Sequence, residues 1–401
     1  RKTLAWQFVN YLKKKYIFLL TSTPVQNNLE ELYNLITLLK PGQLKTYSFF
    51  KKNFIGDSEG LEAKNTERLR GLLSDVMIRN KRSNVDVPFT RRKAVTMGVS
   101  LQPEEQKLYN EISTFIKERY SAQNDNTDNT FLSRFVLKSL QEEMGSSFSA
   151  LSDTLGKLAS NDRLNTFERD MLTDFHGTAA KLAAMELANN SPKFLQLLKI
   201  LREFGDKTII FTKYKATQKS ISDFLRKQQF SVAEFYGGMK RSEKEAQIQY
   251  FRENAHVLVS TESGGEGRNL QFCNGMINFD LPWNPMAIEQ RIGRIHRVGQ
   301  KRTVYVYNLA AKNTVEYYIL DLLDRKINMF ELVVGEVDMI LGDLEEPEDF
   351  SDIIMDAWVR STEPAAMEKE IEELGLKMLE NKKQYIKIKE LDDRIFGEIK
   401  D

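Results

Sequence analysis

The second half of the chain alternates short apolar runs with longer segments in which apolar residues recur at helical spacing. Strands are predicted at residues 207–212, 230–236, 256–261, 275–281 and 303–309, and helices at 214–229, 241–254, 285–296 and 313–329. Strands that alternate with helices of this length predict an α/β domain, in which a parallel sheet carries helices on both faces. Ligands of such sheets gather at the carboxyl ends of the strands, and the motifs discussed below follow strand ends.

The segments before residue 191 are mainly helical. Residues 16–20 (YIFLL) form an apolar run that predicts a buried parallel strand. Leucines and Ile36 then recur at helical spacing from Leu29 to Leu39, until Pro41-Gly42 ends the pattern. A further helix is predicted at 68–79. Residues 103–190 also have a helical pattern, interrupted by a polar stretch at 121–130 that predicts a mobile loop.

The C-terminal segment differs from the rest of the chain. Acidic loops are predicted after Gly342, and residues 366–400 then show apolar positions at a spacing close to 3.5 residues. The positions are Ile371, Leu374, Met378, Tyr385, Ile388, Ile395 and Ile399. Asn381 and Asp392 interrupt this seam, which favours a helical hairpin packed on the rest of the protein over a free coiled coil.

Composition places the chain among globular proteins. Its 401 residues, 41% hydrophobic and 29% charged, predict two or three domains with real cores. No run of about 18 apolar residues occurs, which excludes a membrane-spanning helix. The single cysteine, Cys273, excludes an internal disulfide, and the three scattered histidines argue against a metal site. Residues 1–6 read as the middle of a helix without a signal-peptide layout, so we expect the chain to be a segment of a larger protein.

The net charge of +1 conceals a strong asymmetry. Residues 331–401 carry 9 basic and 21 acidic side chains, whereas the first 330 residues carry 49 basic and 36 acidic ones. A basic body with an acidic end favours a polyanionic partner for the body. Residues 79–93 hold six cations and one acid, and this segment reads either as a solvated linker or as a phosphate-facing element.

Two segments carry residues suited to phosphate chemistry. Arg291, Arg294 and Arg297 repeat every three residues, and an arginine inserted next to a triphosphate stabilises the charge that builds on the γ-phosphoryl oxygens. The alternative is a surface network with Glu289 and Glu266. Upstream, residues 260–270 (STESGGEGRNL) follow an apolar strand, and their glycines let the backbone approach a phosphate. A simple tight turn explains that segment equally well.

Taken together, these segments closely resemble the last two motifs of superfamily-two helicases of the Swi/Snf-like branch. The family pattern has seventeen fixed positions here, and all are met. They are Ser260, Thr261, Gly264, Gly265, Gly267, Asn269, Leu270, Asp280, Trp283, Asn284, Pro285, Gln290, Arg294, His296, Arg297, Gly299 and Gln300. Residues 20–32 resemble the motif that closes the first lobe, with Ser22 in place of the usual glycine. Arg291-Ile292-Gly293, Glu266 and Arg268 resemble bacterial and archaeal members, including the RNA-polymerase-associated translocase, rather than chromatin remodellers.

The resemblance implies a RecA-like lobe and a domain order along the chain. Residues 1–80 would be the C-terminal part of a first RecA-like lobe, 81–100 a basic inter-lobe linker, and 101–190 a helical insertion. Residues 191–330 would form the second lobe, and 331–401 an acidic helical extension.

The resemblance also implies roles for individual residues. Arg294 and Arg297 would be arginine fingers at the carboxyl end of the sheet. Nucleotide contacts would come from Gly265, Gly267, Asn269, Gln290 and Arg291, and nucleotide-state coupling from Thr21, Thr23, Pro24, Gln26 and Asn27. Nucleic-acid contacts, on the opposite rim, would come from Lys213, Tyr214, Gly238, Lys240, Arg241, Ser260 and Thr261. No metal ligands are expected in this chain.

The function implied is that of an ATP-dependent translocase, which moves along duplex DNA without sequence preference by closing and opening two lobes. ATP with Mg²⁺ would be the cofactor, and the protein would be cytoplasmic, or nucleoid-associated in a bacterium. No G-x-x-x-x-G-K-[ST] and no D-E-x-[HDQ] before Thr21 occur, so the Mg²⁺ ligands are expected upstream of residue 1 and the chain should not hydrolyse ATP alone. The alternatives are an RNA-directed or RNA-polymerase-bound motor, with the acidic tail as the protein contact, and a catalytically silent docking module.

Overall fold

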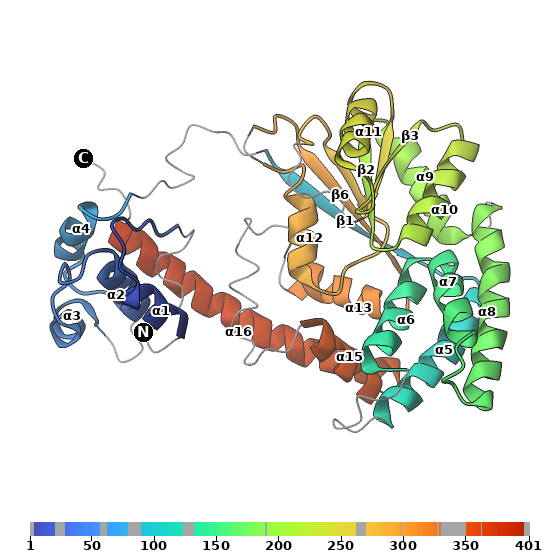
Figure 1. The fold of residues 1–401 in the computed structure, drawn as a ribbon, viewed down its shortest axis with the longest axis horizontal. Helices are drawn as coiled ribbons and strands as arrows, with labels where there is room; N and C mark the ends of the chain where they lie inside the picture. The colour runs from blue at the N-terminus through green and yellow to red at the C-terminus, as the bar shows by residue number, and fades with distance from the viewer. Residues whose placement is uncertain are drawn as a thin grey trace. The chain divides into compact units, whose positions relative to one another are not determined.

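The computed structural model describes residues 4–396 apart from 21–28, 57–61, 79–89, 123–131, 189–190, 262–269, 298, 327–328, 330–349 and 362. The chain divides into two compact units (Figure 1). The first comprises Arg1–Val87, Gly335–Glu345 and Leu376–Asp401, and the second comprises Pro88–Val334 and Glu346–Gly375. Among the described residues, no helix is both long and apolar enough to cross a lipid bilayer.

A six-stranded sheet forms the centre of the second unit. Its strands are β1 (Arg92–Val99), β2 (Thr208–Thr212), β3 (Val232–Phe235), β4 (Val257–Thr261), β5 (Gly275–Asn278) and β6 (Val304–Ala311). They lie in the order β1-β6-β5-β2-β4-β3, and every neighbouring pair is parallel. All residues of β2, β4 and β5 are buried, which explains why these strands appear in the sequence as continuous apolar runs. The predicted α/β class and parallel sheet are confirmed.

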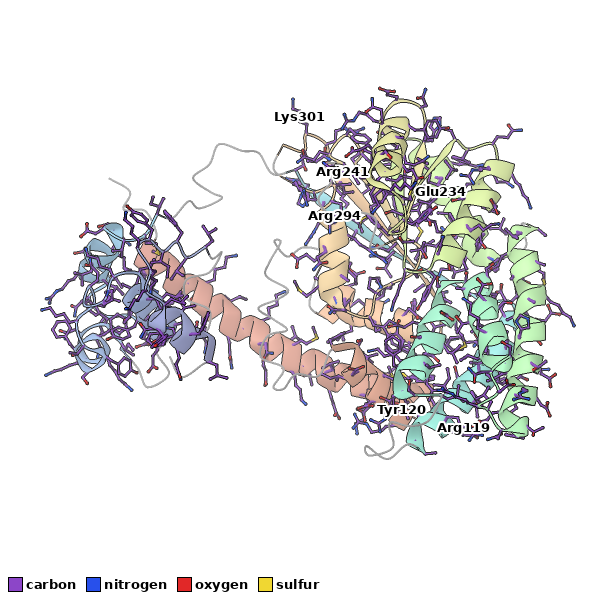
Figure 2. The ribbon with its side chains drawn as sticks, in the orientation of Figure 1. Arg119, Tyr120, Glu234, Arg241, Arg294 and Lys301 are labelled. Carbon is purple, nitrogen blue, oxygen red and sulfur yellow. The ribbon has the colours of Figure 1, made fainter. Side chains whose placement is uncertain are left out.

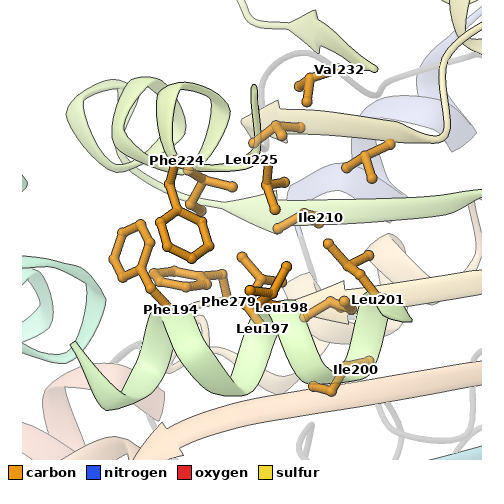
Figure 3. Close-up of a cluster of buried hydrophobic side chains, with 14 of the residues drawn as sticks. Phe194, Leu197, Leu198, Ile200, Leu201, Ile210, Phe224, Leu225, Val232 and Phe279 are labelled. Atoms are coloured by element: carbon orange, nitrogen blue, oxygen red, sulfur yellow. The ribbon is translucent and has the colours of Figure 1, made fainter. Parts of the chain in front are cut away.

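Helices cover both faces of the sheet. On one face, α9 (Pro192–Phe204) and α10 (Lys215–Lys227) enclose a core in which the Phe194 ring meets Phe224 at 5.2 Å and Phe279 at 5.1 Å between centroids (Figure 3). The right-handedness of parallel crossovers assigns α11 (Arg241–Glu253) and α12 (Pro285–Ile292) to the other face. Beyond β6, α13 (Val315–Asp321) continues into a short π-helix, η3 (Leu322–Lys326).

The segment that was predicted to be a helical insertion, which we call the insertion, belongs to the same unit as the sheet. It consists of α5 (Pro103–Ser121), α6 (Arg134–Ser146), α7 (Phe148–Ala159) and α8 (Thr166–Leu187). Buried hydroxyls at the α6–α7 junction fix it to α10, because Ser146 and Ser147 lie 2.9 and 2.7 Å from the Thr217 hydroxyl. Most of the polar stretch predicted as a loop at 121–130 lies outside the described residues.

Residues 92–99 are a correction to the predicted linker at 81–100. They form the edge strand β1, which pairs with β6 from Arg92↔Val304 to Val99↔Ala311. The cationic residues made this segment resemble a linker in the sequence. Long basic side chains can nevertheless run along a sheet surface and keep their charge at its rim. Lys93 accordingly lies 5.9 Å from the centroid of the Tyr305 ring. Charged residues are also common on edge strands, where they discourage pairing with another chain.

The first unit is helical in its described part. Its helices are α1 (Leu4–Tyr11), α2 (Leu29–Leu39), α3 (Tyr47–Phe54) and α4 (Thr66–Ser74), joined by the end of α16 (Pro364–Phe396). Their shared core comprises Leu29, Leu32, Tyr33, Ile36, Leu44, Phe50, Phe54, Ile55, Leu69, Leu73, Leu391 and Ile395.

The predicted strand at 16–20 is wrong. These residues form no strand, and Leu20 is 97% exposed. A buried parallel strand needs hydrogen-bonded neighbours, and the described residues of this unit supply only an isolated bridge between Ile55 and Ala63. The apolar run therefore has no sheet to join among them.

The predicted hairpin at 366–400 is also wrong. A single helix of 33 residues, α16, occupies Pro364–Phe396, and it follows α15 (Phe350–Arg360). Neither Asn381 nor Asp392 breaks it, since both residue types lower helix propensity only modestly. The apolar seam is used nevertheless, because Ile371, Leu374, Met378 and Ile395 are buried.

One glycine tests how closely the insertion packs on α13. A Cβ at Gly145 in α6 would lie 2.1 Å from the Glu316 carboxyl group, whereas a Cβ at Gly177 in α8 meets nothing within 4 Å. We expect Gly145→Ala to lower the melting temperature of the second unit, because overpacking a buried site costs about 1–3 kcal/mol. Gly177→Ala is the matched control and should stabilise by about 0.5–1 kcal/mol through helix propensity. Equal effects of the two substitutions, measured by thermal unfolding, would contradict this packing.

Candidate functional site

We call residues 285–297 the arginine segment. It consists of α12 and the turns that follow it, and one of its sides is more deeply buried than the other. Asn284 accepts a hydrogen bond from the Met286 amide at 2.8 Å, and Pro285 occupies the first helical position, so α12 begins here. After α12 ends, the His296 amide still donates to the Ile292 carbonyl at 2.9 Å, which prolongs the helical course. Ile288, Ile292 and Ile295 are fully buried.

The other side of this segment carries the predicted nucleotide contacts. Gln290 and Arg297 are exposed and Arg294 is half-buried. The spacing of four and three residues brings successive members of this set to neighbouring positions on one face. The Arg297 Nε donates to the Gly293 carbonyl at 2.6 Å, which holds the base of its side chain against the turn. Gln290, Arg294 and Arg297 thus lie on the same side of the segment.

The position of this segment on the sheet is a correction. The arginines were expected at the carboxyl end of the sheet, but the neighbouring residues His296 and Gln300 contact its amino edge. The His296 Nε2 lies 2.8 Å from the Thr90 carbonyl, just before β1. The Gln300 Nε2 donates to the Gln271 and Cys273 carbonyls at 3.0 Å, just before β5. The helix α12 starts after β5 and runs back along the sheet, so its end reaches the edge where the strands begin.

Arg291 has a different environment from its neighbours. Its side chain is 3% exposed, and it donates to the Asn278 Oδ1 at 3.0 Å and to the Asp280 carbonyl at 2.8 Å. It also pairs with the Asp280 carboxylate at 3.4 Å. These contacts assign Arg291 to the interior of the lobe, whereas its nucleotide contact stays a prediction. The alternative partner Glu289 is itself buried, and Glu266 lies outside the described residues.

Asp280 is the centre of a buried polar cluster at the carboxyl edge. The residue is 4% exposed and follows β5 by two positions. Its carboxylate accepts hydrogen bonds from the Lys213 amide at 2.9 Å, from the Ser146 hydroxyl at 2.7 Å and from the Thr212 hydroxyl. We call Asp280 with Ser146, Thr212, Arg291 and the Lys213 amide the Asp280 cluster. It joins the end of β2, the helix α12 and the insertion.

The predicted nucleic-acid residues lie at this same carboxyl edge, either in the last positions of a strand or just after one. Lys213 and Tyr214 follow β2, and both side chains contact Glu142 of the insertion. The Ser260 and Thr261 side chains, at the end of β4, are buried, and the Ser260 hydroxyl donates to the Thr261 carbonyl at 3.1 Å. Arg294 and Arg297 therefore lie toward the amino edge and the predicted nucleic-acid residues at the carboxyl edge, whereas Arg291 contacts Asp280 at the carboxyl edge.

The loop after β3 is the most accessible of these elements. Gly238, Lys240 and Arg241 are exposed. The Lys240 amide donates to the Glu243 carboxylate at 2.8 Å, which fixes the start of α11 and thereby the base of the loop. Figure 2 labels Arg241, together with Arg294 of the arginine segment and Lys301, which follows that segment.

Eight predicted site residues lie outside the described residues. They are Thr21, Thr23, Pro24, Gln26 and Asn27 of the first unit, and Gly265, Gly267 and Asn269 of the glycine-rich segment. Their roles stay predictions. In the part of the chain that is described, no group of three or more His, Cys, Asp or Glu side chains is arranged to hold a metal ion.

Three buried charges near the ends of α6 and α7 were not among the predicted site residues. Glu316 is fully buried and accepts a hydrogen bond from the Trp283 indole at 3.2 Å, and burial raises its pKa to about 7. Burial likewise raises the pKa of Glu186 to about 7, although that carboxylate accepts two amide hydrogen bonds at the start of α7. Burial lowers the pKa of Lys193, whose ammonium group donates to the Gly145 and Ser146 carbonyls. The feature of the sequence that could have indicated a buried polar cluster was Asp280, a charged residue directly after an apolar strand.

Two segments of the chain match known protein families. Residues 192–299 match the helicase conserved C-terminal domain, and they contain α9, α12 and the strands from β2 to β5. Residues 1–158 match the SNF2-related domain. The part of the second unit from α9 to the arginine segment is therefore a helicase C-terminal domain, and the chain belongs to the SNF2-related helicases.

Individual relatives agree with this assignment. The chain is 42% identical over 344 residues to an uncharacterized ATP-dependent helicase, YqhH, of Bacillus subtilis, covering 86% of this chain and 59% of that protein. It is 25% identical over 350 residues to the ATP-dependent DNA helicase DDM1 of Arabidopsis thaliana, covering 82% of this chain and 43% of that protein. The chain thus spans about three fifths or less of the length of these relatives.

Among solved structures, the SWI2/SNF2 ATPase core domain of Sulfolobus solfataricus is 24% identical, with a TM-score of 0.43, and the match covers 88% of this chain and 66% of that one. The C-terminal part of the Fun30 ATPase domain is 17% identical, with a TM-score of 0.46, covering 68% of this chain and 99% of that one. These scores are low, and the family assignment stands on the sequence matches.

The raised pKa of Glu316 predicts a pH dependence of stability. Between about pH 5 and 7 the folded carboxyl group holds a proton that the unfolded one releases, so this group makes stability fall as pH rises through that window. Glu316→Gln removes the effect, and its stability relative to the natural protein should rise with pH, by at most about 1.4 kcal/mol per pH unit. Thermal unfolding of both proteins across about pH 5–8 measures this, and parallel curves would show that Glu316 does not titrate in this way.

Proposed function

We propose that the complete protein is an ATP-driven translocase acting on duplex DNA, to which this chain contributes two arginine fingers. One observation carries the proposal: Arg294 and Arg297 lie on the accessible side of a segment whose other side is fixed by Ile292 and Ile295. A segment held by apolar packing positions these side chains, and positioning must precede charge stabilisation by an inserted arginine. Membership of the SNF2-related helicases supports ATP as the nucleotide.

The chemistry assigned to this chain is electrostatic. During phosphoryl transfer, negative charge spreads over the γ-phosphoryl oxygens, and guanidinium groups stabilise it. In our proposal Gln290, Gly265, Gly267 and Asn269 contact the nucleotide, and Arg291 holds α12 in register with β5. The sequence contains no phosphate-binding loop of the form G-x-x-x-x-G-K-[ST], so this cradle and the Mg²⁺ ligands belong to the rest of the complete protein. Mg²⁺, when bound there, neutralises phosphate charge.

The nucleic-acid site is proposed at the carboxyl edge of the sheet. Gly238, Lys240 and Arg241 form its accessible part, and Lys213, Tyr214, Ser260 and Thr261 lie at neighbouring strand ends. Contacts from cations, hydroxyls and backbone amides follow the phosphate chain and do not read sequence. Cycles of lobe closure and opening, with Thr21, Thr23, Pro24, Gln26 and Asn27 coupling the lobes to the nucleotide state, would then move the protein along one strand. The acidic C-terminal segment is a proposed contact for a protein partner such as RNA polymerase.

The finger assignment is tested by conservative substitution in the complete protein. Arg294→Lys and Arg297→Lys keep the charge but remove the planar guanidinium group. We expect DNA-stimulated ATP hydrolysis to fall by on the order of 10³-fold or more, while nucleotide affinity stays within about tenfold. DNA affinity should hardly change, because the DNA loops lie at the other edge of the sheet.

Arg302→Lys is the matched control for this experiment. Arg302 follows the same segment but forms a surface ion pair with Asp206, in which both side chains are 43% exposed. Its replacement should leave hydrolysis unchanged. Hydrolysis that survives both finger substitutions, with only a lower melting temperature, would make these arginines structural. A complete protein without any ATPase activity would instead favour the silent docking module.

The nucleic-acid site is tested by salt dependence. Each phosphate neutralised contributes about −0.9 to the slope of log K against log salt concentration on duplex DNA. Replacing Lys240 and Arg241 by alanine should therefore make the slope shallower by up to about 1.8. The control is the double replacement of Arg163 and Lys181, which are exposed on the insertion and change the net charge equally. An equal change of slope in both variants would show that binding follows overall charge and not this loop.

A further inference from the structure

We propose that Asp280 is a positioning residue that couples the arginine segment at the amino edge of the sheet to the proposed DNA loops at the carboxyl edge. The inference rests on the proposed function. It starts from an arrangement of buried groups: one carboxylate binds groups that belong to both proposed sites and to the insertion.

The first half of the connection runs from the nucleotide side. Arg291 precedes Arg294 by three residues, in the last turn of α12. Side chains in a helix point toward its N-terminus, so the guanidinium group of Arg291 reaches back toward the edge where β5 ends. It meets the Asp280 carbonyl at 2.8 Å and the carboxylate at 3.4 Å, and stacks 5.6 Å from the centroid of the Phe211 ring in β2.

The second half runs to the nucleic-acid side. The Asp280 carboxylate accepts the Lys213 amide at 2.9 Å and also binds the hydroxyl of Thr212. Thr212 is the last residue of β2, and Lys213 is the first residue of the loop proposed to contact DNA. A backbone amide held in this way fixes where the loop leaves the strand. Asp280 therefore fixes the backbone position from which the Lys213 and Tyr214 side chains extend.

A third contact brings in the insertion. The Ser146 hydroxyl donates to the same carboxylate at 2.7 Å, and it also lies 2.9 Å from the Thr217 hydroxyl in α10. Thr217 is fully buried, and Ser146 and Asp280 are nearly so. Water is therefore not available to replace a lost partner within the Asp280 cluster.

These contacts make the cluster suited to transmit movement. A buried carboxylate that loses its arginine or its hydrogen-bond donors is left with an uncompensated charge, which is among the costliest defects in a protein interior. A shift of α12 on nucleotide binding therefore has to move Asp280 together with Arg291. Asp280 in turn moves the start of the β2 loop and the end of α6. The coupling is carried by hydrogen bonds of fixed length and requires no change in the sheet.

The test measures the coupling in the complete protein. The dissociation constant for a duplex DNA is determined with and without a non-hydrolysable ATP analogue and Mg²⁺, and the ratio of the two values reports the coupling. Couplings of this kind typically amount to about 5–150-fold. Asp280→Asn is nearly isosteric and removes the charge. We expect it to bring the ratio to within about twofold of unity, whereas a merely structural role would lower the melting temperature and leave the ratio unchanged.

The control is Asp206→Asn, which removes the aspartate of a surface ion pair in the same lobe and should keep the natural ratio. If Asp280→Asn does not fold, Thr212→Val removes one donor to the carboxylate at constant volume and should lower the ratio by at least about threefold. A folded variant of either kind with the natural ratio overturns the inference. A natural protein that binds no DNA overturns the proposed function itself, so the two failures are distinguishable.

Discussion

Burying the Asp280 carboxylate imposes the constraint on which the arrangement of the second unit depends. A charge removed from water must be compensated by an opposite charge and by hydrogen-bond donors at fixed positions. Here the compensation comes from Arg291 of α12, Thr212 and the Lys213 amide at the end of β2, and Ser146 of α6. These elements are separated by long stretches of sequence, so satisfying one side chain fixes their mutual positions. Apolar packing alone would tolerate small displacements among them.

The same requirement explains why the helical insertion is part of the lobe. Besides Asp280, two other buried charged residues meet the end of α6, namely Lys193 of α9 and Glu316 of α13. Lys193 donates to two carbonyls at the end of α6, and Gly145 leaves the space that the Glu316 carboxyl group occupies. An interface of this kind is specific because each polar group has one place where it is satisfied. The insertion is therefore positioned by polar contacts on a domain that apolar contacts hold together.

The sequence predicted those features that depend on local pattern. The buried strands β2 to β6 and the helices between them were found, because burial on both faces leaves continuous apolar runs. The edge strand β1 was missed, since cations on an edge look like a linker, and residues 16–20 were misread because apolarity does not supply a pairing partner. The arginine segment was identified by its motif but assigned to the wrong edge of the sheet. The direction of α12 and the partners of Arg291 and Asp280 depend on tertiary contacts that no local pattern encodes.

The pairing of β1 with β6 has a consequence for how the lobe is made. Arg92 lies opposite Val304, so the first strand of the sheet in the sequence finds its neighbour only when the last one exists. Closing so long a loop carries an entropic penalty that nearer contacts do not, and contacts of high sequence separation form slowly. During synthesis on a ribosome, the strands β2 to β5 can assemble in the order in which they are made. The strand β1, although made before them, has no neighbour in the sheet until β6 has been made. The edge of the sheet is thus completed by the strand of the sheet that was synthesised first.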